Sequence, residues 1–281
     1  MSLLDCGGKT LDLSQPLVMG ILNVTPDSFS DGGRFLSPAA ALSQARRLWE
    51  EGAALIDVGG ESTRPGAQGV STEEELARVI PVIQTLAQEL PIPISVDTSK
   101  AEVMRAAVRA GAGFINDVQA LRGANALATA AELGVPVCLM HMRGEPRTMQ
   151  ANPHYMNLLS EVQEFLQQRI DSCEQAGIPR EQLLIDPGFG FGKQLGHNLE
   201  LLAHLNQFQS LGVPLLIGLS RKSMLGSLTG RPVEQRLAAG LAAAVLAVER
   251  GARIVRTHDV APTLDAIRVT WAVAGSVRSS G

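Results

Sequence analysis

Eight short apolar segments, separated by longer amphipathic segments, recur along the whole chain. Most are nearly continuous in Val, Ile, Leu and Ala, which is typical of parallel strands that are covered on both faces. Strands that alternate with helical segments indicate an α/β fold with a parallel sheet. Eight such units predict a closed (β/α)8 TIM barrel. The expected strands are Leu17 to Leu22, Ala54 to Val58, Ile92 to Val96, Gly113 to Asn116, Val135 to Met140, Leu183 to Ile185, Pro214 to Gly218 and Arg253 to Val255.

The segments between these strands carry helix start and stop signals. Ser37-Pro38 is expected to open the first helix, and Gly52 to end it. The second can begin with a capping box, made either by Ser71 with Glu74 or by Thr72 with Glu75. Ser99 with Glu102 predicts a capping box at the start of the third helix. Further helices are expected at about 124–133, 157–176, 198–211, 232–250 and 262–274. No linker or composition break interrupts the pattern, so we expect one domain over residues 1–281.

The amino-acid composition narrows the kinds of molecule that the chain is expected to bind. The chain has 281 residues, of which 45% are hydrophobic and 19% charged, with a formal net charge of -4. A soluble globular protein with a large core is expected, and neither nucleic acid nor a membrane is expected as a partner. Cys6, Cys138 and Cys173 form no CxxC pattern, which favours reduced thiols. No signal peptide or long apolar segment is evident, so we expect a cytoplasmic location.

Polar residues follow every one of the expected strands. In a barrel these positions converge on one face, where barrel enzymes place their active sites. A single polar residue there is usually a helix cap, but capping does not explain polar residues of mixed chemistry at eight strand ends. The residues are Asn23; Glu61, Ser62, Thr63 and Arg64; Asp97; Asn116 and Asp117; His141; Asp186; Ser220, Arg221 and Lys222; and Arg256, Thr257 and His258.

These residues divide into two chemical groups. Arg64, Arg256 and His258, with Asn23 and Ser62 or Thr63, supply cations and donors suited to a phosphate or pyrophosphate. Asp97, Asn116 and Asp186 suit a heteroaromatic ligand with an amino group and a ring NH, because a carboxylate can accept two parallel N–H bonds. No further carboxylates stand near Asp97 and Asp186 to complete a metal shell, so a metal bound mainly by protein is not expected.

Two loops and one lysine add to this expected site. The loop of residues 23–33 is long for a connection from strand to helix, which indicates a lid. The glycine-rich segment 186–192 brings backbone close to a ligand and offers Phe191 as an apolar platform. Lys222 lies beyond its strand beside another cation, which favours a hydrogen-bonding role over a Schiff base. The phosphate-binding patterns GxGxxG and GxxxxGK[ST] are both absent.

Taken together, the motifs resemble the dihydropteroate synthase family of pterin-binding TIM barrels. In order and spacing, its signature segments are similar to MGILNVTPDSFSDGG, DVGGESTRPGA, SVDTSKAEV, INDV, MHMRGEPRTMQ, DPGFGFGK, GLSRKSM and RTHDV. They span residues 19–260. Arg143 and Gln119 depart from the residues usual at their positions, which concerns fine loop structure only.

The resemblance implies the reaction of a dihydropterin-methyl diphosphate with 4-aminobenzoate in folate biosynthesis, which sulfonamides inhibit in this family. It also implies a homodimer. Mg²⁺ would be the cofactor, with Asn23 as its one protein ligand. By resemblance, Asp97, Asn116, Asp186 and Lys222 hold the pterin, with Met140 packed against the ring. Thr63, Arg64, Arg256, Thr257 and His258 bind the substrate at the diphosphate end, and Phe191, Pro65, Ser220, Phe29 and Thr63 line the aminobenzoate pocket. The expected catalytic residues are Asp97, Lys222 and Arg256.

Two other functions fit part of this pattern. A pterin-binding barrel of the methyltransferase type shares the pterin acceptors but does not need Arg64, SRKSM or RTHDV. A non-catalytic pterin-binding paralogue would be expected to lack Asp97, Lys222 or the loop of residues 23–33, and the sequence retains all three.

Overall fold

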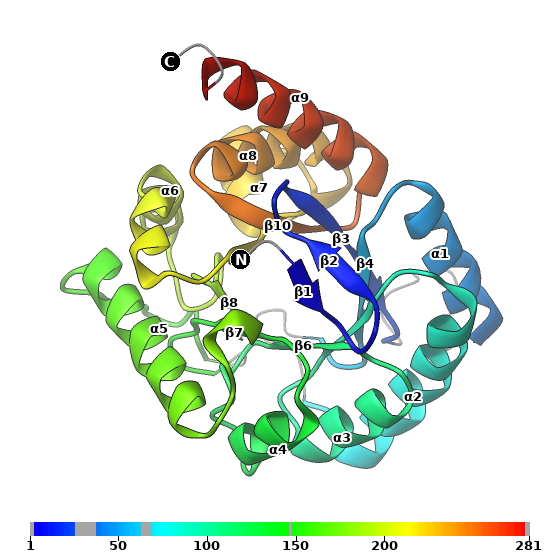
Figure 1. Ribbon diagram of the computed structural model, residues 1–281. Helices are drawn as coiled ribbons and strands as arrows, with labels where there is room; N and C mark the ends of the chain where they lie inside the picture. Colours follow the sequence, from blue (N-terminus) through cyan, green and yellow to red (C-terminus); the bar gives the residue numbers. More distant parts are fainter. Residues whose placement is uncertain (1–2, 26–37, 63–68, 146–147, 279–281) are drawn as a thin grey trace.

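Eight parallel strands close into a barrel, and helices surround it (Figure 1). The computed structural model describes residues 3–25, 38–62, 69–145 and 148–278. The order around the barrel is β10-β3-β4-β5-β6-β7-β8-β9, which confirms the predicted (β/α)8 class. The strands are β3 (Leu17–Asn23), β4 (Leu55–Gly59), β5 (Ile94–Asp97), β6 (Phe114–Asp117), β7 (Val137–Met140), β8 (Leu183–Asp186), β9 (Leu215–Gly218) and β10 (Ala252–Thr257).

The helices follow the predicted order with one addition. The sequence did not predict α7, which has only seven residues and contains Gly226. The expected helix at 198–211 divides into α6 and the 3₁₀ helix η3. The helices are α1 (Pro38–Glu50), α2 (Thr72–Glu89), α3 (Ala101–Arg109), α4 (Ala126–Leu133), α5 (Leu158–Gln175), α6 (Leu195–Ala203), α7 (Ser223–Thr229), α8 (Leu237–Glu249) and α9 (Val260–Arg278), with η2 (Arg180–Gln182), η3 (Leu205–Leu211) and η4 (Val233–Gln235).

The two predicted capping boxes had different outcomes. At α2 the pair is Ser71 with Glu74, and both reciprocal hydrogen bonds form. At α3 the prediction was wrong: the cap residue is Lys100, without a side-chain cap bond. The Ser99 hydroxyl donates instead to the carboxylate of Asp117. The buried Asp117 carboxylate is a strong acceptor for this hydroxyl, and α3 begins one residue later than predicted.

The barrel interior changes from apolar to polar within two residues along the strands. One buried cluster includes a layer of interior side chains, namely Met19, Leu55, Phe114, Cys138, Leu184, Leu216 and Ile254. Side chains two residues apart on a strand point the same way. The next interior positions are Ile21, Asp57, Asn116, Met140, Asp186, Gly218 and Arg256. Polar side chains therefore lie inside the barrel toward the strands' C-terminal ends.

A short antiparallel hairpin, β1 (Leu3–Asp5) and β2 (Thr10–Asp12), covers the opposite end of the barrel. Leu4 and Leu11 belong to the same buried cluster as the apolar interior layer, and Figure 1 shows the hairpin in front of the strands. In its turn, the Lys9 ammonium donates to the carbonyls of Ala87, Leu90 and Ile92 at 3.1, 2.7 and 3.1 Å. The hairpin closes this end, so a ligand can reach the polar layer only from the other.

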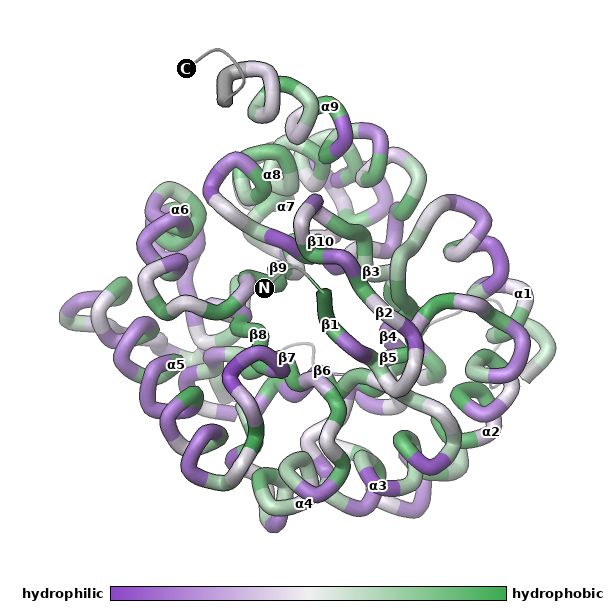
Figure 2. Tube along the Cα trace, viewed as in Figure 1, coloured by the Kyte–Doolittle hydropathy of each residue, from purple (hydrophilic) through white to green (hydrophobic). Residues whose placement is uncertain are grey.

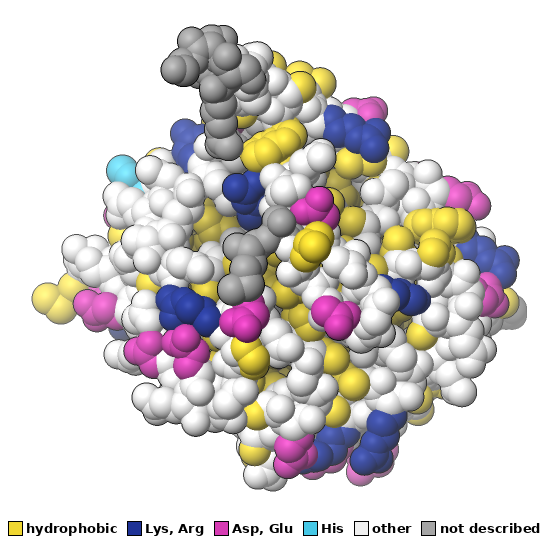
Figure 3. Space-filling model, viewed as in Figure 1, with side chains coloured by type: hydrophobic (Ala, Val, Ile, Leu, Met, Phe, Trp, Pro, Cys, Tyr) yellow, Lys and Arg dark blue, Asp and Glu magenta, His cyan; other side chains and the backbone are white. Residues whose placement is uncertain are grey.

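The outer surface differs from helix to helix. Figure 2 shows α5 largely in hydrophilic colours, whereas α8 is mainly hydrophobic. On the face drawn in Figure 3, acidic and basic side chains are interspersed. In the described part of the chain, no helix combines the length and apolarity that a membrane span needs. Cys6, Cys138 and Cys173 are buried and unbridged.

The contact between the hairpin and β6 gives a stability prediction. A methyl group on Gly113 would lie 2.0 Å from the carbonyl oxygen of Cys6. Gly113→Ala should therefore lower the free energy of unfolding by about 1 to 3 kcal/mol, the usual cost of overpacking. Urea unfolding followed by circular dichroism measures this. Gly196→Ala in α6 is the control, because nothing lies within 4 Å of the added methyl. Equal stability of the two variants would show that the hairpin does not pack as described.

Candidate active site

A buried carboxylate, Asp57, connects three other polar side chains inside the barrel. It is fully buried (0% exposed) in the middle of β4. Its oxygens accept hydrogen bonds from the Ser95 hydroxyl at 2.5 Å, the Asn116 amide at 3.0 Å and Nε of Arg256 at 2.6 Å. Since a buried charge is tolerated only when it is paired, these bonds explain how Asp57 is accommodated.

Arg256 joins the two groups of residues that the sequence separated. Besides Asp57, its guanidinium donates from Nη2 to Oδ2 of Asp97 at 2.8 Å. Burial lowers the pKa of Arg256, but the attraction of Asp57 and Asp97 outweighs it, so the pKa is raised overall. Arg256, which the sequence assigned to an anionic ligand, thus contacts Asp97, which the sequence assigned to a heteroaromatic ring.

The strand register places Asn23 beside the same network. Asn23 pairs with Gly59 of β4, and Gly59 pairs with Asp97 of β5. A methyl group on Gly59 would lie 3.7 Å from both Oδ1 of Asn23 and Oδ2 of Asp97. Asp97 pairs in turn with Asn116 on β6. Three predicted residues therefore stand at one level on β3, β5 and β6.

Asp97 titrates near neutrality. Burial raises the pKa of this carboxyl to about 7, against the opposing effect of Arg256 and with further increases from Asp57, Glu75 and Asp117. The charge of Asp97 therefore changes near neutral pH. Such a perturbed carboxyl inside a concave polar region is typical of an active site.

Asp186 and Lys222 occupy the other side of the interior. Asp186, at the end of β8, accepts from the backbone N–H of Gly188 at 2.7 Å, and burial raises its pKa. Lys222 lies 4.2 Å over the ring of Phe191 and donates to the carbonyl of Phe189. Burial lowers the pKa of Lys222 to about 8, although Asp186 opposes this change. The ammonium thus lies between the ring of Phe191 and a backbone carbonyl.

An apolar wall, formed by Val118, Met140, Met142, Met149 and the partly buried Phe191, stands next to these charges. The sequence predicted Met140 and Phe191 from this set but missed Val118, Met142 and Met149, which lie on loops beyond the strands. A flat ring could pack on this wall while its polar edge meets the carboxylates.

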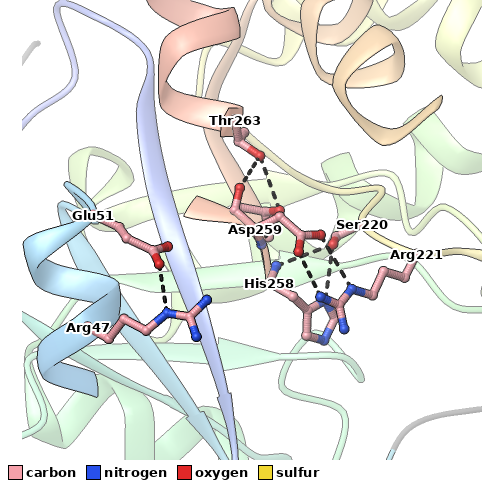
Figure 4. Close-up of polar contacts among 8 residues, drawn as sticks. Arg47, Glu51, Ser220, Arg221, His258, Asp259 and Thr263 are labelled. Carbon is pink, nitrogen blue, oxygen red and sulfur yellow. Dashed lines mark hydrogen bonds and ion pairs between the residues drawn. The ribbon is translucent and has the colours of Figure 1, made fainter. Parts of the chain in front are cut away.

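The ends of β9 and β10 are tied together by polar contacts, which Figure 4 shows. The Ser220 hydroxyl lies 3.0 Å from Nδ1 of His258 and accepts the backbone N–H of His258 at 3.2 Å. Arg221 donates to both oxygens of Asp259, at 2.7 and 3.3 Å. Arg221 also has a left-handed backbone, with φ of 59°. The contacts place Ser220 with His258, and they fix the turn that leads to Lys222.

Thr257 points in a different direction from Arg256. Its hydroxyl accepts from the backbone N–H of Asp259 at 3.1 Å and lies 3.3 Å from the hydroxyl of Thr263 on α9. Because neighbouring strand residues face opposite sides, Thr257 faces the helices while Arg256 faces the interior.

Known proteins resemble this chain over nearly its full length. The family described as pterin binding enzyme matches residues 19–258. A dihydropteroate synthase of Haemophilus influenzae is 54% identical over 95% of this chain and 98% of its own length, and one of Escherichia coli is 55% identical over 94% of each. The chain belongs to the dihydropteroate synthase family.

Solved structures of this family share the fold. The Yersinia pestis dihydropteroate synthase with a sulfonamide drug complex has a TM-score of 0.94 at 51% identity, covering 98% of this chain and 99% of that one. The Xanthomonas albilineans dihydropteroate synthase in complex with 7,8-dihydropteroate has a TM-score of 0.89 at 55% identity, covering 97% and 98%.

Four predicted site residues of this dihydropteroate synthase family member, Phe29, Thr63, Arg64 and Pro65, lie outside the described residues. Among the described ranges, no group of three or more His, Cys, Asp or Glu side chains could hold a metal. Asp57 is the main polar residue that the sequence interpretation missed. The available signal was a charged residue in the middle of an otherwise apolar strand, two positions after Leu55.

Asp57→Asn tests whether the buried carboxylate sets the position of Arg256 and Asn116. We expect kcat/KM for dihydropteroate synthesis to fall by about 10- to 100-fold, because misplaced binding groups cost that much. Removing the charge also removes one cause of the raised pKa of Asp97, so the acidic limb of the pH profile, expected near pH 7, should move to lower pH.

Ser95→Ala is the matched control, because it removes one hydrogen bond to Asp57 without touching Arg256 or Asn116. It should leave the pH profile in place. An unchanged acidic limb in Asp57→Asn would contradict the assigned coupling, whatever the loss of stability.

Proposed function

We propose that this chain condenses (7,8-dihydropterin-6-yl)methyl diphosphate with 4-aminobenzoate to give 7,8-dihydropteroate and diphosphate, using the polar interior of the barrel as its active site. The observation that carries the site assignment is the direct contact of Arg256 with Asp97 and Asp57. It brings an anion-binding group and pterin-binding groups to one point. In the reaction the amine nitrogen bonds to the pterin methylene carbon, the bond from that carbon to diphosphate oxygen breaks, and the amine releases a proton.

The pterin is assigned to the carboxylate side of the interior. Asp97, Asn116 and Asp186 would accept from and donate to the polar edge of the ring, with Lys222 beside them. The apolar wall, including Met140, would cover one ring face. As diphosphate departs, positive charge develops on the methylene, and the nearby carboxylates would stabilise it. An arylamine is already a neutral nucleophile, so no strong general base is required.

The leaving diphosphate is assigned to Arg256 and His258, with Thr63 and Arg64. A guanidinium has five N–H donors, and the bonds to Asp57 and Asp97 use Nε and Nη2. The Nη1 group is the donor that we assign to the diphosphate. Two carboxylates hold the guanidinium in place before the substrate arrives, so it needs little rearrangement as charge develops.

Mg²⁺ fits as the cofactor, with Asn23 as its protein ligand. The amide oxygen of Asn23 faces the interior next to Gly59 and Asp97. Mg²⁺ prefers oxygen ligands and is commonly held by one or two protein groups together with substrate phosphates. When bound, it would neutralise charge on the diphosphate.

The 4-aminobenzoate is assigned to the region of Phe191, with Pro65, Ser220 and Phe29. A non-catalytic or methyltransferase-type barrel would have no need of the diphosphate donors. The presence of Arg256 and His258 on β10 and its loop therefore favours the synthase reaction.

A cytoplasmic homodimer is the proposed working form. The buried, unbridged cysteines support a reducing location. The homodimer is supported by α8, where apolar side chains reach solvent every four residues or so along one face: Leu237, Ala238, Ala242 and Leu246 are exposed, and Leu241 and Val245 partly so. A face of this kind is typical of a symmetric interface.

Diphosphate release tests the proposed reaction. The purified protein mixed with the pterin diphosphate, Mg²⁺ and 4-aminobenzoate should release diphosphate and form dihydropteroate. Arg256→Ala should lower kcat by about 100- to 1000-fold, the usual loss for one transition-state donor. Arg253→Ala on the same strand is the control and should retain activity, because Arg253 lies over Trp271 rather than in the interior.

Arg256→Lys separates folding from chemistry, since it keeps a cation for Asp57 and Asp97 while removing the planar fork. It should fold like the parent chain and show an intermediate loss. No diphosphate release from the parent chain, or release unaffected by Arg256→Ala, would overturn the proposed mechanism.

Leu246→Glu tests the proposed dimer. A charge on the α8 face, where Leu246 is 38% exposed, should weaken association by more than about tenfold. Sedimentation at several concentrations measures this. Met156→Glu is the control, because Met156 is 95% exposed on a loop. Equal sedimentation of both variants and the parent would place the interface elsewhere or contradict the dimer.

A further inference from the structure

A buried lysine, Lys193, lies at the end of the loop that connects β8 to α6. It is only 2% exposed. Its ammonium donates to the carbonyls of Gly188 at 2.9 Å and Phe191 at 3.1 Å, and it lies 2.8 Å from Nδ1 of His141. Burial lowers the pKa of Lys193 well below its usual value, although Asp186 opposes this change. An amino group in either charge state has at least two N–H donors, which is enough for both carbonyls.

His141 is the partner that joins Lys193 to another strand end. It follows β7 and is buried, with its ring edge-on to Phe165 at 4.9 Å between centroids. Burial, followed by the charge of Lys193, lowers the pKa of His141 to about 2. The ring is therefore neutral, and its Nδ1 lone pair can accept from the ammonium while Nε2 carries the proton.

The loop of residues 187–194 is folded around this ammonium. Gly188, Gly190 and Gly192 all have left-handed φ values, of 74°, 79° and 63°, which let the loop turn so that the carbonyls of Gly188 and Phe191 both reach Lys193. Asn198 of α6 fixes the same loop by accepting from the N–H of Gly190 at 2.7 Å. These bonds present the ring of Phe191 to the active site, where Lys222 lies over it.

We propose that Lys193 is a positioning residue that sets the place of Phe191, and thereby the affinity for the aromatic amine, without itself contacting a substrate. The proposal rests on the proposed function, in which Phe191 lines the 4-aminobenzoate pocket. An apolar residue at position 193 would leave the carbonyl of Phe191 without its ammonium donor, and the carbonyl of Gly188 with only the backbone N–H of Phe191, at 3.2 Å. Because such groups are costly to leave unpaired, the loop would then relax and carry Phe191 with it.

The test is a double-mutant cycle between positions 193 and 191. Lys193→Met should raise the KM for 4-aminobenzoate by about tenfold, which is the change expected when the net contribution of one hydrogen bond that positions Phe191 is lost. The KM for the pterin diphosphate should change by less than about twofold, and Phe191→Ala should also raise the amine KM. In the Phe191→Ala background, Lys193→Met should add less than about twofold, because the ring that it positions is gone.

Lys9→Met is the matched structural control. Lys9 also uses its ammonium on three acceptors, all of them carbonyls, but it lies in the hairpin at the opposite end of the barrel. It should lower the melting temperature and leave both KM values unchanged. If Lys193→Met does not fold, His141→Leu takes its place, since it removes the partner that links the Lys193 amino group to the end of β7. The amino group is then held less firmly against the two carbonyls, so the amine KM should rise by about threefold.

The possible results distinguish the positioning role of Lys193 from the proposed function of the protein. Independent, multiplicative effects of Lys193→Met and Phe191→Ala would overturn the positioning role, as would equal increases in both KM values. An unchanged amine KM in Phe191→Ala would remove Phe191 from the amine pocket, and Lys193 would lose its proposed role with it. Absence of diphosphate release by the parent chain would instead refute the proposed function.

Discussion

The contact of one cation with two carboxylates organises the interior of the barrel. Arg256 is held by Asp57 and Asp97, and Asp57 also accepts from Asn116. Removing the guanidinium would leave the fully buried Asp57 without its cation, which costs about 3 to 5 kcal/mol in such pairs. The same contact fixes groups on β4, β5, β6 and β10 relative to one another. The network thus replaces apolar packing in the upper interior and orders the groups that meet a substrate.

The position of this network follows from the two-residue period of strands. The hairpin β1–β2 and the apolar interior layer close one end of the barrel, and the next interior positions carry the polar side chains. Apolar packing below provides the rigidity that the polar layer cannot supply for itself. Asp97 and Lys222, whose pKa values shift to about 7 and about 8, are poised near neutrality because the layer excludes much of the solvent.

Much of this arrangement could be predicted from sequence, for a definite reason. Near-continuous apolar strands and polar residues after each strand are local patterns, so the barrel order and residues such as Asp97, Asn116, Asp186, Lys222 and Arg256 could be identified directly. Asp57 was missed because the strand ends alone were compared, although its place two residues after Leu55 matches that of Asn116 after Phe114. The cap role expected of Ser99 failed because its acceptor, Asp117, lies on a neighbouring strand, and such pairings are not written in local sequence.

Two lysines show why a set of backbone acceptors alone does not define function. Lys9 and Lys193 each direct an ammonium at three acceptors, yet one lies under the barrel and the other beside the apolar wall. The first ties the hairpin to the turn after α2, where no substrate is expected. The second holds carbonyls on either side of Phe189, whose own carbonyl accepts from Lys222. Lys193 therefore fixes the loop of residues 187–194 from inside, and Lys222 fixes it from the active site. A substitution of either lysine should move Phe191 through the backbone of the loop. A loss of activity alone therefore does not identify the cause, whereas the energetic coupling between substitutions at positions 193 and 191 does.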